Sequence, residues 1–272
     1  MPFTLSHPAA VLPLLRRPFS RAALVAGAVA PDMPYFVVTT GLPVSAQSWY
    51  EPFVNATTSH TALGAATVSL PYALALWALL RAGHRPLASL LPIPGPSPSP
   101  RTAGALTRRA GWIVLSALIG VGTHLIWDAF THHDGFFVTH APWLTSSLVG
   151  SLTWARALQH ASTIGGLAAI AVYVWRGRAH LVTGKSRTGP GDATRSLAVL
   201  ATTLLVMAGA VVHAWWLAAT QATTAGLPLD VTVEGVLSDA AKGAGVTLIG
   251  LGVLYMTGWW IRYAVGPKPA AP

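Results

Sequence analysis

The sequence predicts an all-α fold, a polytopic membrane bundle of about six transmembrane or re-entrant helices. Of its 272 residues, 53% are hydrophobic and only 9% are charged, whereas soluble domains carry about 25% charged residues. The mean hydropathy is +0.54. Apolar segments that approach the roughly 20 residues needed to cross a bilayer recur along the whole chain. These features exclude an ordinary soluble domain and indicate an integral membrane protein.

Six apolar segments make up the expected bundle: 22–40, 61–80, 110–130, 161–175, 197–219 and 244–262. The first contains two prolines and an aspartate, which favour a break in a helix, and the fourth is short and rich in glycine. We expect one integral membrane domain over residues 1–272. Its polar site is expected within 1–145, and 161–272 adds membrane helices without an assigned role.

Basic residues alternate between the connecting segments. Five Arg or Lys residues fall in 81–109 and five in 176–195, but 131–160 holds only Arg156 and 220–243 is acidic. The positive-inside rule therefore predicts a multi-pass protein of the cell membrane with both termini in the cytoplasm. The net charge of +9 is spread in short clusters between apolar runs, which suits anionic membrane lipid and not nucleic acid.

The densest polar pattern lies at the end of the third apolar segment, in residues 120–135. His124 and Asp128 are four positions apart, so on a helix their side chains lie on one face about 6 Å apart. Ionisable groups at membrane depth are costly and by default mark a functional site. Because the chain has no cysteine, a metal ion would have to be held by His, Asp or Glu. The alternative is that these residues are interfacial and form hydrogen bonds with neighbouring helices.

Three further polar residues precede this segment. His7 lies at a helix start, Asp32 lies between two prolines, and His60 lies at the entrance to the second apolar segment. Singly, each also fits a capping or interfacial role. Together with His124 and Asp128 they offer the imidazoles and carboxylates of a metal centre. Of the other histidines, His140 and His160 are expected to be ordinary loop residues, and three are not assigned to the site: His84, His180 and His213.

Four sequence elements follow one another along the chain: Ser-His-Pro-Ala at 6–9, Ala-Pro-Asp-Met-Pro-Tyr-Phe at 30–36, His60, and Thr-His-Leu-Ile-Trp-Asp-Ala-Phe-Thr-His-His-Asp-Gly at 123–135. In this order the chain resembles the DUF4184 family of membrane proteins. It is more distantly similar to the inner-membrane metal-dependent hydrolases of the YdjM type. The resemblance covers about residues 1–145, and it implies these metal ligands: His7, Asp32, His60, His124 and Asp128.

The chain departs at two positions from the pattern of the YdjM-type proteins, and this limits the number of metal ions that we expect it to bind. Pro34 follows Met33 where a second acidic residue would stand, and Asn55-Ala-Thr replaces a His-Arg pair. Two ligands of a dinuclear site are therefore missing, which favours one metal ion or none.

The expected topology leaves two arrangements for the N-terminus. If 22–40 crosses the bilayer straight, His7 is separated from His60 and Asp128 by roughly 30 Å. If residues 1–40 instead form a re-entrant hairpin, which the prolines would permit, His7 can join the other ligands.

The leading functional hypothesis is a membrane-embedded, metal-dependent hydrolase that acts on a lipid-like or phosphoester substrate. The cofactor would be a divalent metal ion such as zinc, and His132 or Asp134 would serve as general base. The alternative is a non-catalytic membrane protein, either an ion- or proton-coupled transporter or a structural partner of a membrane complex. Prenyl-diphosphate chemistry is disfavoured because no Asp-rich run is present to bind magnesium.

Overall fold

The structure is a computed structural model that describes residues 3–38, 42–90, 102–182, 192–220 and 229–265. Residues 91–101 and 183–191, within the basic segments expected to be cytoplasmic, lie outside the described residues. The predicted all-α class is confirmed, since the only sheet in the described part is a hairpin of β1 (Ser147–Val149) and β2 (Leu152–Thr153). The chain divides into two compact units, Met1–Arg81 with Pro96–Thr183 and Ala82–Gly95 with Gly184–Pro272.

Four helical stretches of the described chain are long and apolar enough to cross a membrane: Ala62–Ala88, Ala103–His140, Trp154–Gly177 and Gly243–Val265. A shorter apolar helix covers Leu200–Trp215. The expected number of six spanning or re-entrant helices therefore stays a prediction. The stretch around 161–175 is longer than predicted because its helix begins at Trp154.

The first apolar segment does not form one straight helix. It consists of α1 (Arg21–Val29), the 3-10 turn η2 (Ala30–Asp32) and α2 (Met33–Val38), with a proline at the start of η2. Before it, the 3-10 helix η1 (Thr4–Leu14) folds back, so that Val11 packs against Leu24 and Ala28 of α1. The fold-back of η1 onto α1 is the contact that the hairpin alternative requires, while a re-entrant or a crossing path of 22–40 through the membrane stays a prediction.

The long helix α7 (Ala103–Thr131) supports this hairpin. The Thr102 side chain caps its N-terminus by accepting a hydrogen bond from the Ala105 amide. Its small apolar residues pack against α1, and a Cβ added to Gly27 would overlap the Ala117 carbonyl oxygen. Likewise, a Cβ on Gly120 would overlap the Leu24 carbonyl oxygen. The two backbones therefore approach as closely as only glycine permits.

Short helices lead into and out of the long ones. Before α6 (Leu70–Leu90) come α3 (Glu51–Val54), α4 (Ala56–Ser59), α5 (Ala62–Gly64) and the π-helical turn η3 (Ala65–Ser69). After α7 come α8 (Phe136–His140), α9 (Pro142–Thr145), the β-hairpin and α10 (Trp154–Val182), which packs against η1. This arrangement brings η2, the end of α4 and the C-terminal end of α7 together.

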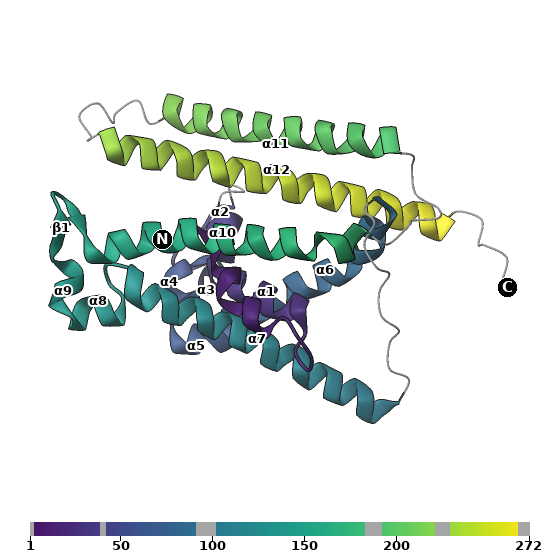
Figure 1. Cartoon of the computed structure of the whole chain (residues 1–272), viewed down its shortest axis with the longest axis horizontal. Helices are drawn as coiled ribbons and strands as arrows, with labels where there is room; N and C mark the ends of the chain where they lie inside the picture. The colour runs from purple at the N-terminus through teal and green to yellow at the C-terminus, as the bar shows by residue number, and fades with distance from the viewer. Residues whose placement is uncertain (1–2, 39–41, 91–101, 183–191, 221–228, 266–272) are drawn as a thin grey trace. The chain divides into compact units, whose positions relative to one another are not determined.

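The second unit contains the helix pair α11 (Asp192–Thr220) and α12 (Leu229–Val265), which lie side by side (Figure 1). Its packing also depends on glycine, since a Cβ on Gly209 would overlap the Thr247 side chain. In the last turns of α6, Pro86 has no amide hydrogen for the Ala82 carbonyl four residues earlier. Trp260 Nε1 donates to that carbonyl oxygen at 3.1 Å and joins α12 to α6.

Candidate metal centre

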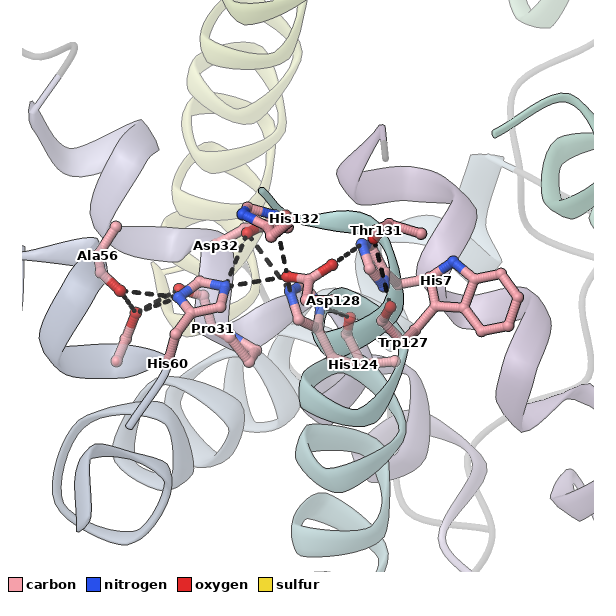
Figure 2. Close-up of polar contacts among 12 residues, drawn as sticks. His7, Pro31, Asp32, Ala56, His60, His124, Trp127, Asp128, Thr131 and His132 are labelled. Atoms are coloured by element: carbon pink, nitrogen blue, oxygen red, sulfur yellow. Dashed lines mark hydrogen bonds and ion pairs between the residues drawn. The ribbon is translucent and has the colours of Figure 1, made fainter. Parts of the chain in front are cut away.

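Six side chains from distant parts of the sequence meet near the C-terminal end of α7 (Figure 2). His7 comes from η1, Asp32 from η2 and His60 from the C-cap of α4. The other three come from α7 and its C-cap residue His132. We call this set the His/Asp cluster: His7, Asp32, His60, His124, Asp128 and His132. Every ligand that the resemblance implied is in it, and so is one of the two expected base candidates.

Four central members have the spacing of a single metal site. His124 Nε2 lies 3.1 Å from Asp128 Oδ2 and 3.4 Å from Asp32 Oδ1. His60 Nε2 lies 3.3 Å and 3.6 Å from the same two oxygen atoms. One donor atom from each of the four residues lies within 4.8 Å of the others. Tetrahedral ligands about 2.0–2.1 Å from a zinc ion are about 3.4 Å apart, which matches these distances.

Backbone carbonyl groups fix the ring orientation of two histidines. His60 Nδ1 lies 2.7 Å from the Ala56 carbonyl oxygen, and His124 Nδ1 lies 2.8 Å from that of Ala28. Because a carbonyl oxygen can only accept, Nδ1 must carry the hydrogen in both rings. In the neutral rings, the lone pair of Nε2 then points at the carboxylates. This is the usual arrangement of a metal-binding histidine.

Apart from their contacts with one another, eight buried nitrogen and oxygen atoms of the cluster have no hydrogen-bond partner. These atoms are the Nε2 of all four histidines and both carboxylate oxygens of Asp32 and Asp128. Asp128 Oδ2 alone faces three Nε2 atoms, at 3.1 Å from His124, 3.3 Å from His60 and 3.5 Å from His132. Protons on all three rings would bring three positive charges together. A single metal ion that takes one atom from each of Asp32, His60, His124 and Asp128 would remove the need for those protons, so these four residues can hold one.

His7 lies against the face of this site. Its ring stacks on His124 with centroids 3.7 Å apart, and its Nε2 lies 3.6 Å from Asp128 Oδ1. Burial, with a smaller effect of the neighbouring His124, lowers the pKa of His7 to about 4. His7 is therefore neutral near pH 7 and retains a lone pair for a metal ion.

His132 and Asp134 lead from the cluster towards the surface. The His132 side chain is 20% exposed, whereas that of His124 is fully buried. Asp134 is 73% exposed, and its Oδ1 lies 3.8 Å from His132 Nδ1. Asp134 is thus outside the buried cluster but beside its most accessible histidine. His140 and His160 are exposed and lie outside the cluster.

Sequence reasoning missed the groups that hold the ligands. Nothing in the residue types of Ala28 and Ala56 signals that their carbonyl oxygens orient two imidazoles. Ser59 is fully buried, and its hydroxyl donates to the Pro31 carbonyl oxygen at 2.7 Å, which links α4 to η2. Only its position beside His60 could have drawn attention to it.

Comparison with known proteins gives one match. A family model described as "Domain of unknown function (DUF4184)" matches residues 1–257. No curated protein and no solved structure matches the chain. The match extends well beyond the residues 1–145 on which the resemblance rested, and the more distant likeness to YdjM-type proteins stays a prediction.

Proposed function

The chain belongs to the DUF4184 family, and we propose that it is a membrane-embedded, metal-dependent hydrolase. The observation that supports this proposal most directly is the convergence of eight buried nitrogen and oxygen atoms that, apart from their contacts with one another, have no hydrogen-bond partner. Buried polar groups without partners are rare in proteins because each costs about 1–3 kcal/mol. A bound ion is the simplest explanation for so many at one point.

Four residues would hold a divalent metal ion, with zinc suited to two imidazoles and two carboxylates: Asp32, His60, His124 and Asp128. His7 would be a further ligand through Nε2. When bound, such an ion supplies a Lewis acid and lowers the pKa of a coordinated water molecule.

His132 is the best-placed general base of the chain. Its side chain is 20% exposed and its Nε2 faces Asp128, so that it can accept a proton from a water molecule at the centre. Asp134 lies on the opposite side of the ring, where it can orient Nδ1 and stabilise the imidazolium that forms. His132 and Asp134 are thus proposed as the catalytic residues, with Asp134 acting through His132.

The position of the centre along α7 favours a lipid-like or phosphoester substrate at the membrane surface. Nineteen positions separate Arg109 from Asp128, which is about 28 Å of helix and close to the roughly 30 Å thickness of the hydrocarbon layer. With Arg109 at one headgroup boundary, Asp128 lies at the other. Exposed aromatic residues near that end of α7 are typical of a membrane interface: Trp127, Phe136, Trp143 and Trp154.

Metal analysis of protein purified in detergent tests the proposal. The protein reconstituted with zinc should hold about one equivalent of metal, and the His124→Ala, Asp128→Ala variant should lose most of it. His160→Ala is the control, because that residue is exposed outside the cluster. Wild-type protein without stoichiometric metal, or a double variant that keeps it, would overturn the metal centre and favour the non-catalytic alternative.

A further inference from the structure

The helix that carries His7 is poorly stabilised by its own hydrogen bonds. η1 is an 11-residue 3-10 helix with Pro8 and Pro13 inside it, and the side chain of its N-cap residue Phe3 forms no capping bond. Runs of 3-10 helix longer than about 3–4 residues are uncommon, and proline donates no backbone hydrogen bond. Its neighbours must therefore hold η1 in place.

One of those neighbours is α10. The Phe3 amide donates to Thr163 Oγ1 at 3.1 Å. One turn further along α10, a Cβ added to Gly166 would lie 2.9 Å from the Ser6 carbonyl oxygen and 3.0 Å from the Ser6 Cβ. The backbone of η1 thus rests directly on a glycine, at the residue that precedes His7.

η1 also rests on α1 and α7. Val11 packs against Leu24 and Ala28, and the ring of His7 stacks on His124. η1 is therefore held by α10 together with α1 and α7, so that a displacement at Ser6 moves His7 relative to Asp128. Ligand distances at a metal centre tolerate only about 0.2 Å of change.

We propose that α10 belongs to the scaffold of the metal centre and that Gly166 is a positioning residue, which sets the distance between His7 and Asp128. This inference rests on the proposed function, because it takes His7 as a metal ligand. It gives a role to α10, most of which lies in residues 161–272, the part of the chain for which the sequence pattern indicated no role.

Adjacent glycines on α10 provide a matched test. A Cβ on Gly165 meets no atom within 4 Å, whereas one on Gly166 meets the backbone of η1. The Gly166→Val variant should bind zinc about 10–100-fold more weakly, as expected for loss of an outer-shell contact, and Gly165→Val should bind as the wild type does. Zinc affinity is measured by competition with a chromogenic chelator, and thermal unfolding of the metal-free protein reports the fold.

A double-mutant cycle with His7→Ala separates positioning from a general structural effect. If Gly166 acts through His7, the Gly166→Val change should not weaken zinc binding further in the His7→Ala background. If Gly166→Val does not fold, Thr163→Val removes the acceptor of the Phe3 amide at nearly constant volume, and its effect should likewise vanish without His7. Equal loss in both backgrounds, or a Gly166→Val protein with wild-type affinity, overturns the inference alone. A wild-type protein that binds no zinc overturns the proposed function as well.

Discussion

At the level of single residues, the reactivity of a histidine here depends on what lies beyond its own helix. His60 and His140 have the same local setting. In each, Nδ1 lies 2.7 Å from the carbonyl oxygen four residues earlier and 3.1 Å from the hydroxyl of the preceding residue. Only His60 directs Nε2 at two buried carboxylates, whereas the ring of His140 stacks on Phe136 at the surface.

This pair yields a prediction with an internal control. Replacing His60 with Gln should lower zinc affinity by more than the roughly 100-fold expected for an outer-shell residue, because it removes a donor that faces the metal. The same change at His140 should leave zinc affinity unchanged. Zinc competition titrations on both variants provide the measurement, and equal losses would show that His60 is not a ligand.

The sequence could name the ligand types but not their orientation. His124 and Asp128 follow from helical spacing on a segment that was expected to be helical, and the structure places them 3.1 Å apart on α7. The ring orientation of His124 instead depends on the Ala28 carbonyl oxygen, which is 96 positions away. No local pattern encodes a contact of that range, so the resemblance, and not residue spacing, linked His7 and Asp32 to this pair.

At the level of elements, the contact between α1 and α7 brings the two halves of the centre together. The backbones approach at Gly27 and Gly120, and the Ser20 amide that precedes α1 donates to Ser116 Oγ on α7 at 3.0 Å. This approach lets His124 reach the Ala28 carbonyl oxygen, and it places Asp32, just beyond α1, against His124.

A side chain at Gly120 should therefore affect both stability and metal binding. Gly120→Val forces an isopropyl side chain against the backbone of α1, and such overpacking costs about 1–3 kcal/mol. The expected result is a lower Tm of the metal-free protein together with weaker zinc binding. Gly122→Val is the matched control, since a Cβ there meets no atom within 4 Å.

Differential scanning fluorimetry in detergent with and without a chelator measures the first effect, and chelator competition measures the second. If Gly120→Val and Gly122→Val behave alike, close packing of α1 on α7 does not hold the centre together.

Hydropathy predicted the long helices better than the short ones. The apolar run at 110–130 became α7, but the run at 22–40 broke at η2, where Pro31 lies at the start of the turn. A hydropathy window averages over such a break. The fold-back of η1 onto α1 is set by packing of Val11 and by contacts with α10, which a one-dimensional pattern does not contain.

For the whole molecule, the proposed function depends on how the chain lies in the membrane. The family match reaches residue 257, and four helical stretches are long and apolar enough to cross. The alternation of basic segments still predicts cytoplasmic loops at 81–109 and 176–195. The proposed substrate class depends on a further quantity, the depth of the His/Asp cluster.

The chain contains no cysteine, so single spin labels can report this depth. Three exposed leucine or isoleucine positions on α7 are suitable for substitution by cysteine: Leu106, Leu118 and Ile126. Leu118 lies midway between Arg109 and Asp128, and Ile126 lies about 12 Å further along the helix.

In lipid nanodiscs, power-saturation electron paramagnetic resonance should find the Leu118→Cys label most accessible to oxygen and least accessible to a water-soluble nickel chelate. The Leu106→Cys and Ile126→Cys labels should both shift towards the chelate, because each lies near a headgroup boundary of a layer roughly 30 Å thick. Each variant should still bind one zinc ion, which shows that the label has not disturbed the centre. A label at Ile126 as deep as that at Leu118 would place the centre in the middle of the bilayer, out of reach of a lipid headgroup, and would leave the metal centre without the proposed substrate.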